Sequence, residues 1–151
     1  MGILDSLSIS ASALTAERTR MDVTAENLAN AQTTRTDAGD AYRRKVVVLQ
    51  EATATRFGRT LDGAINGPAG AVNGSAGGVR VAQIAQDATP NRLVYDPGHP
   101  DADAEGYVRM PNVDTVAEMV DLISASRAYE ANVTAMNAAK QMFSKTLDIL
   151  R

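Results

Sequence analysis

The residues best suited to chemistry lie in a short polar stretch at positions 96–105, with the sequence DPGHPDADAE. It contains the chain's one histidine, His99, and then Asp101, Asp103 and Glu105 at alternate positions, a spacing that some calcium loops use. A histidine among carboxylates also suits a hydrolytic site. The rest of a calcium loop is absent, however, no nucleophile stands at a suitable spacing, and the Gly and Pro residues beside His99 favour a tight turn. We therefore expect a structural turn, with a metal or catalytic site as the less favoured alternative.

The composition argues against several classes of function. The 151 residues carry 15 basic and 18 acidic side chains, a net charge of −3, so the chain lacks the basic field that nucleic acids attract. There is no cysteine, which excludes disulfides and thiolate metal sites. No apolar run approaches the roughly 20 residues of a membrane span, and no phosphate-binding loop, dinucleotide fingerprint or zinc spacing occurs. We expect a protein that is not an enzyme, binds no cofactor or nucleic acid, and does not insert into a membrane.

The elements that must position these residues are dominated by a C-terminal helix at 112–151, a stretch without Gly or Pro. Thr115 and Glu118 have the spacing of a capping box, in which the hydroxyl and the carboxylate satisfy backbone donors at a helix start. Apolar residues recur every seven positions, which is the period of a coiled-coil seam. At about 1.5 Å per residue this helix would run roughly 55 Å, longer than a compact domain of this size is wide.

A second amphipathic helix is expected from Ile3 to about Thr34, with the same seven-residue period. The two helices are either the core face of an antiparallel bundle or coiled-coil seams that other subunits cover, and their length favours the second interpretation. Asn27 and Asn30 share one face near the end of the first helix. Asn30 is expected to compete with the backbone and end the helix, the alternative being a buried contact that fixes register against a neighbour.

The middle of the chain has a different character, because ten of the eleven glycines and all five prolines lie between positions 37 and 111. Strands are predicted at 41–50, 79–84, 92–95 and 107–110, and a flexible loop at 57–78. The sequence thus predicts a mainly α fold with a small β module, the two long terminal helices pairing as a coiled coil. The expected parts are an N-terminal helix at 1–35, a β/loop module with a flexible insertion at 36–111, and a C-terminal helix at 112–151.

Several motifs resemble those of a known family. The sequence NLANAQT at 27–33 resembles the motif that closes the N-terminal helix of bacterial flagellar axial proteins, the rod and hook family. The stretch YDPGHPDADAEGYVRMPNV at 95–113 is similar to a longer, more specific motif of one member, a protein of the proximal rod. Residues 118–121 and 124–132 match the C-terminal helix of the same member. The stretch 57–78 departs from it, being longer and richer in Gly and Ala.

The resemblance implies a structural subunit whose terminal helices assemble into the hollow shaft that transmits motor torque to the hook. It implies partners among other rod proteins (FlgB, FlgF, FlgG and FliE), copies of the chain itself, and the flagellar type III export apparatus. The location implied is the periplasmic rod of the basal body, reached without a cleaved signal peptide, which fits an N-terminus with an acid at Asp5 and no basic flank. The alternative is a soluble helical adaptor or chaperone that binds partners through its amphipathic terminal helices.

Assembly contacts are expected from the two apolar seams and from polar residues beside them. Arg127 and Glu130 are spaced for a pair on one helix, worth about 0.2–0.5 kcal/mol, or for contacts with a staggered neighbour. The full set of expected contact residues is Leu7, Leu14, Met21, Asn27, Leu28, Asn30, Leu122, Arg127, Tyr129, Glu130, Asn132, Val133, Met136, Phe143, Leu147 and Leu150.

Overall fold

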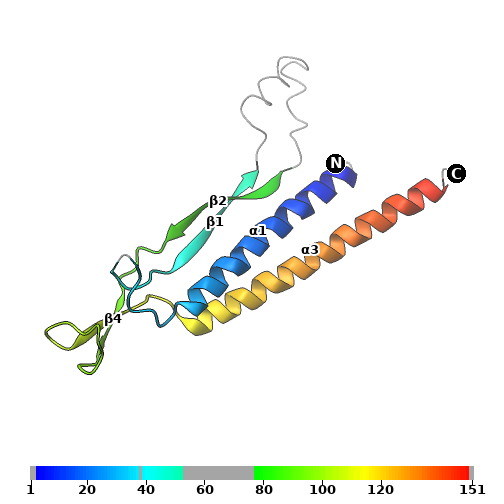
Figure 1. Cartoon of the computed structure of the whole chain (residues 1–151). Helices are drawn as coiled ribbons and strands as arrows, with labels where there is room; N and C mark the ends of the chain where they lie inside the picture. Colours follow the sequence, from blue (N-terminus) through cyan, green and yellow to red (C-terminus); the bar gives the residue numbers. More distant parts are fainter. Residues whose placement is uncertain (1–2, 38, 53–76, 150–151) are drawn as a thin grey trace, which may run out of the picture. The chain divides into compact units, whose positions relative to one another are not determined.

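The computed structural model describes residues 3–37, 39–52 and 77–149 of the chain. Two long helices and two small sheets make up the described part (Figure 1). In chain order the elements are α1 (Ile3–Ala29), β1 (Lys45–Ala52), β2 (Gly78–Gln86), β3 (Arg92–Tyr95), β4 (Tyr107–Met110) and α3 (Thr115–Ile149). The expectation of a mainly helical protein with a small β part is confirmed. No helix among the described residues is both long and apolar enough to cross a lipid bilayer.

The strand predictions can be compared element by element. Strands β3 and β4 have the predicted bounds, whereas β1 begins four residues later than expected and β2 is longer at both ends. Strand β1 pairs with β2, and β3 pairs with β4. The loop predicted at 57–78 lies outside the described residues except for Gly77 and Gly78, and so does Leu150.

The chain divides into two compact units, and both helices and the strands β1 and β2 contribute to each. The first unit comprises Met1–Glu17, Leu49–Ala82 and Ala128–Arg151, and the second comprises Arg18–Val48 and Gln83–Arg127. The sequence predicted a different division, into residues 1–35, 36–111 and 112–151. That division stays a prediction.

The hairpin β3–β4 belongs to the second unit and is antiparallel, with Leu93 opposite Arg109 and Tyr95 opposite Tyr107. Because side chains alternate along a strand, Val108 is buried while its neighbours are exposed. The rings of Tyr95 and Tyr107 meet edge to face at 5.3 Å. Gly106 has a φ of +84°, and a Cβ there would lie 3.0 Å from the Tyr95 ring, so the turn before β4 requires glycine.

The turn between β3 and β4 contains His99 and is held by its own polar groups. The backbone N–H of His99 donates to the Asp96 carbonyl, and the Asp101 N–H donates to His99 Nδ1. Asp103 Oδ1 accepts from the N–H groups of Glu105 and Tyr107. The carboxylates thus act as turn-forming acceptors, as the sequence predicted.

Helix α3 begins differently from the prediction. Its cap is Asp114, whose Oδ1 accepts from the N–H groups of Val116 at 2.9 Å and Ala117 at 3.4 Å. The predicted capping box of Thr115 and Glu118 is therefore wrong, because the Glu118 side chain points into the protein interior instead of back to the helix start.

Helix α1 ends at Ala29, earlier than the predicted Thr34. The side chain of Asn30 competes there for a backbone acceptor of the last helical turn. Asn30 Nδ2 donates to the Glu26 carbonyl at 2.9 Å, and the Thr33 hydroxyl donates to Asn30 Oδ1 at 3.1 Å. The interpretation of Asn30 as a helix-ending residue is confirmed.

In the first unit, the start of β2 lies close against α1. Ser12 Oγ donates to the Ile9 carbonyl and accepts from the Val79 N–H at 3.1 Å. A Cβ on Gly78 would lie 2.7 Å from Ser12 Oγ. Glycine is therefore the residue that permits this close approach.

Candidate functional site

The interior of the described part is built mostly from small apolar residues and contains unusual polar ones. Its buried apolar side chains are Ala16, Val23, Ala41, Tyr42, Val108, Ala125 and Ala139. The largest fully buried side chains, however, are those of Glu118, Val108 and Asn27. Because a buried carboxylate or amide is costly unless it is paired, Glu118 and Asn27 identify the place where this fold depends on polar contacts.

Glu118 lies on α3 and is 1% exposed. Its Oε1 accepts from Arg44 Nε at 2.6 Å, and its Oε2 accepts from Asn27 Nδ2 at 3.0 Å. The hydrogen bond with Glu118 raises the pKa of Arg44, against the lowering effect of burial. Arg44 also lies 3.5 Å from Asp121 and 3.8 Å from Asp87. The guanidinium is therefore shared among three carboxylates, of which only Glu118 is fully buried.

Asn27 lies on α1, is 1% exposed and uses its full hydrogen-bonding capacity. Its Nδ2 donates to Glu118 and, at 2.8 Å, to the Lys45 carbonyl. Its Oδ1 accepts from the Tyr42 hydroxyl and from the Lys45 N–H, each at 2.9 Å. One side chain thus joins the end of α1 to the segment that leads into β1 and to the start of α3.

We call this set of connected side chains the polar cluster; its members are Glu26, Asn27, Tyr42, Arg44, Lys45, Asp87, Glu118 and Asp121. All of them belong to the second unit. Glu26 pairs with Lys45, whose ammonium lies 5.9 Å from the centre of the Tyr42 ring. The buried donors and acceptors of Asn27 and Glu118 are occupied by one another and by their neighbours. The arrangement is therefore suited to fixing three chain segments together and offers no free nucleophile or base for catalysis.

Tyr42 gives the polar cluster a measurable response to alkali. Burial, together with the charges of Glu26 and Glu118, raises the pKa of Tyr42 from 10.0 to about 12. In the unfolded chain the phenol of Tyr42 ionises near its ordinary pKa of 10.0. The preference of the folded chain for the neutral phenol therefore contributes fully to the free energy of unfolding below pH 10. It is lost as the pH rises from 10 through about 12, and amounts to roughly 2–3 kcal/mol.

We expect the free energy of unfolding to fall over that alkaline range more steeply in the parent chain than in Tyr42→Phe. Denaturant unfolding at a series of pH values, with tyrosinate absorbance recorded in parallel, measures both quantities. Tyr95→Phe is the matched control, because Tyr95 is exposed and lies outside the polar cluster. An identical slope in the parent and in Tyr42→Phe would contradict the assignment.

A second feature is the apolar surface of α3. Its first turns expose Val116, Met119, Val120 and Ile123, which recur at helical spacing on one face. Its last turns expose Met142, Phe143 and Leu147. We call these groups the leading patch and the trailing patch, and they belong to the second and the first unit, respectively. Single exposed apolar residues are ordinary, but contiguous ones typically indicate an interaction surface.

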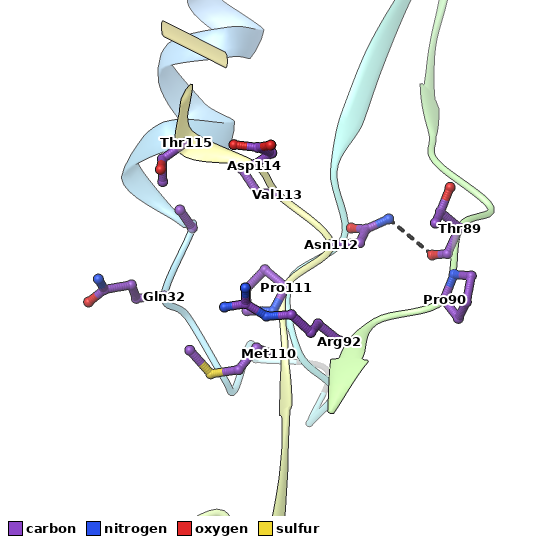
Figure 2. A pocket seen from close by; sticks show the side chains of 11 residues that line it. Gln32, Thr89, Pro90, Arg92, Met110, Pro111, Asn112, Val113, Asp114 and Thr115 are labelled. Carbon is purple, nitrogen blue, oxygen red and sulfur yellow. Dashed lines mark hydrogen bonds between the residues drawn. The ribbon is translucent and has the colours of Figure 1, made fainter. Parts of the chain in front are cut away.

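A cleft of about 540 Å³ lies beside the start of α3 in the second unit (Figure 2). Asn112 spans its wall, with Nδ2 donating to the Thr89 carbonyl at 3.0 Å and Oδ1 accepting from the Arg44 N–H at 2.8 Å. Arg92 and Met110 line it opposite Gln32. The lining mixes apolar and polar side chains without a convergent group of acids and bases, so the cleft is a recess in the surface next to the leading patch.

The predicted contact residues fall into three groups by exposure. Asn27 is buried in the polar cluster, and Leu150 lies outside the described residues. The half-buried ones are Leu7, Leu14, Met21, Leu28, Asn30, Leu122, Tyr129, Asn132, Val133 and Met136, and the exposed ones are Arg127, Glu130, Phe143 and Leu147.

The alternative site around His99 does not assemble into a metal centre in the described part of the chain. No group of three or more His, Cys, Asp or Glu side chains there is placed to hold a metal ion. Asp101 instead accepts from the Thr34 hydroxyl at 2.8 Å and lies 3.8 Å from Arg35.

Sequence reasoning did not find the roles of Glu118, Tyr42 and Arg44. A signal was present for Glu118, because it precedes Leu122 by four residues and Ala125 by seven. That spacing places it on the inward face of α3, where a carboxylate needs a partner. No comparable signal existed for Arg44, because its partner is 74 residues away in the chain.

Comparison with known proteins agrees with the motifs. A family described as "Flagella basal body rod protein" matches residues 7–35, and one described as "Flagellar basal body rod FlgEFG protein C-terminal" matches residues 104–149. These matches cover the N-terminal motif, strand β4 and helix α3.

Full-length relatives are more specific. The chain is 49% identical over 153 residues to "Flagellar basal-body rod protein FlgC" of Bacillus subtilis, covering 99% of each chain. It is 45% identical to the protein of that name from Borreliella burgdorferi, covering 100% of this chain and 99% of the relative. It is 36% identical to the one from Aquifex aeolicus, covering 98% and 97%. The comparisons do not favour the adaptor alternative, and the chain belongs to the FlgC family of flagellar basal-body rod proteins, structural components of the flagellum that are not enzymes.

Proposed function

We propose that the chain assembles through its terminal helices, paired as a coiled coil, into the hollow proximal rod that transmits torque from the motor to the hook. Its partners in this proposal are copies of itself and the rod proteins FlgB, FlgF, FlgG and FliE. Export by the flagellar type III apparatus without a cleaved signal peptide delivers it to the periplasmic part of the basal body. Membership of a rod protein family supports the proposal.

The observation that carries the proposal is the apolar surface of α3. Both of its patches expose large side chains that water solvates poorly, including Phe143 at 46% and Leu147 at 52%. Burying apolar surface against neighbours stabilises an assembly by about 25 cal/mol per Å². The half-buried seam residues, such as Tyr129 and Met136, can gain further contacts in the same way.

The polar cluster suits a subunit that carries mechanical load. It connects the end of α1 to the start of α3 by hydrogen bonds and ion pairs in fixed geometry. A force applied to one helix within the second unit therefore reaches the other through short polar contacts as well as through packing. We propose that this connection keeps the second unit from shearing under torque.

The test is to remove trailing-patch side chains that the free chain does not need. Phe143→Ala combined with Leu147→Ala should leave the melting temperature of the purified chain nearly unchanged, because both side chains are about half exposed. Incorporation into rods should fall by about tenfold or more, since the variant forgoes roughly 2 kcal/mol of apolar burial. Rod content of purified basal bodies and swimming in soft agar measure the effect.

Gln141→Ala combined with Ser144→Ala is the matched control, because both positions are exposed on the same turns of α3 and carry polar side chains. The control variant should assemble as the parent does. Normal incorporation of the Phe143→Ala, Leu147→Ala variant into rods would contradict the proposal. A large drop in the melting temperature of the purified variant would also contradict it, because the two side chains would then belong to the core of the free chain.

A further inference from the structure

The β3–β4 hairpin has an exposed face that the helices do not explain. Leu93, Tyr95 and Tyr107 are exposed, with Tyr95 at 64%, although all three are large. The pairing register puts them on one face together with Arg109, which is opposite Leu93. Tyrosine and arginine are the residue types that interfaces favour, because they combine a large contact area with hydrogen bonding.

A cleft of about 370 Å³ adjoins this face at the base of the hairpin. Two exposed arginines, Arg43 and Arg109, line it together with Leu93 and one exposed acid, Asp40. The cleft therefore carries one more cation than acid, and its net positive charge fits a ligand with carboxylates.

The opposite end of the same hairpin has the complementary chemistry. Its turn carries four acids within ten residues, at positions 96, 101, 103 and 105. The Glu105 carboxylate makes no hydrogen bond or ion pair within the described part of the chain, and the residue is exposed.

The turn is also ordered before any contact forms. Backbone hydrogen bonds join Asp96 to Gly106, Ala102 to His99, and Asp103 to Tyr107. A segment held in this way loses little conformational entropy on binding, so its charges act at low cost.

We propose that the basic cleft at the base of the β3–β4 hairpin in one copy of the chain binds the acidic turn of a neighbouring copy. This proposal rests on the proposed function and names a contact between subunits that does not use the terminal helices. Carboxylates of the turn pair with Arg43 and Arg109, which line the cleft. The turn cannot reach its own cleft, because strands of four residues hold the two ends of the hairpin roughly 13 Å apart.

The contact joins two different surfaces, so it is heterologous and repeats from copy to copy. Such contacts generate rings or helical arrays, whereas a contact of one surface with itself generates only a closed dimer. A tubular shaft is the kind of assembly that heterologous contacts build.

Cysteine cross-linking tests the contact directly, because the chain has no cysteine of its own. Two full-length variants of different tag size, Arg109→Cys and Glu105→Cys, are co-expressed in a motile host, and basal bodies are oxidised. We expect a disulfide between the two variants and no product from either variant alone. The control variant is Arg80→Cys, which is used in place of Arg109→Cys. Arg80 is an exposed arginine of β2 in the first unit, so the control should give no disulfide with Glu105→Cys.

Charge reversal supplies the functional arm of the test. Arg109→Glu and Glu105→Arg should each lower incorporation into rods by about tenfold, because each places like charges together. The double variant restores the opposite pairing and should recover to within about twofold of the parent.

Two results would overturn the inference while leaving the helix-based assembly intact. One is the absence of the 105–109 disulfide in rods whose incorporation still depends on Phe143 and Leu147. The other is a cross-link to a different rod protein, recognised by its mass, when Arg109→Cys carries a thiol-attached photo-cross-linker, which would show that the cleft binds another partner. If incorporation into rods depended neither on the hairpin residues nor on the helix patches, that result would instead contradict the proposed function.

Discussion

Replacing Arg44 with Met is expected to lower the free energy of unfolding by about 3–5 kcal/mol, the cost of leaving a buried charge without its partner. Glu118 would keep only its hydrogen bond from Asn27, in a site where its side chain is 2% exposed. Asp121 and Asp87 would suffer less, because their side chains are 41% and 27% exposed and water can solvate them. Urea denaturation of the purified chain measures the change.

The companion variants separate the ion pair from general damage. Arg43→Met alters the neighbouring arginine, which is exposed, and should change stability by less than about 0.5 kcal/mol. Arg44→Met combined with Glu118→Met removes both charges and should regain a large part of the loss, because apolar residues can replace a buried pair with little net cost. A double variant less stable than Arg44→Met alone would show that the carboxylate is not the origin of the penalty.

Replacing Asn27 with Asp is expected to be at least as damaging, with a loss of about 4 kcal/mol or more. The change replaces the donor Nδ2 by an oxygen that faces the Glu118 carboxylate at 3.0 Å and the Lys45 carbonyl at 2.8 Å. Two hydrogen bonds become two repulsions, and two carboxylates share one buried site.

The comparison for Asn27 is Asn30, three residues further along the chain. Asn30 is half-buried and its amide bonds only to local groups, so Asn30→Asp should cost about 1 kcal/mol. Thermal and chemical unfolding of both variants test the contrast. Equal losses would mean that the four hydrogen bonds of Asn27 have no special weight in this fold.

The sequence predicted those features that local rules determine. The short strands β3 and β4 lie between strong turn signals, and the long helix α3 follows from forty residues without Gly or Pro. The turn at His99 was predictable because Pro97, Gly98 and Pro100 restrict the backbone there. In each case the cause and the effect lie within a few residues of one another.

The errors occurred where a local rule competed with a distant partner. The Thr115–Glu118 spacing permits a capping box, but a stronger contact with Arg44 takes the Glu118 side chain into the interior. Likewise, Tyr42, Arg44, Val46 and Val48 occupy every second position, as in a strand, and this pattern suggested that β1 starts at residue 41. Strand β1 starts at Lys45 because Tyr42 and Arg44 are engaged by the polar cluster. Single-sequence patterns carry no information about partners that far apart.

The separation of Asn27 from Glu118 by 91 residues also has a kinetic consequence. A nascent chain grows from its N-terminus, so most of it must be synthesised before the carboxylate that Asn27 and Arg44 need becomes available. Closing a loop of this length carries an entropic cost that is recovered only when the contacts form. Until then Asn27 can bond only to Tyr42 and Lys45, which lie nearby in the chain, and the contacts that join α1 and Arg44 to α3 cannot form. Completion of the polar cluster is thus a late, non-local event that waits for the synthesis of Glu118 and Asp121.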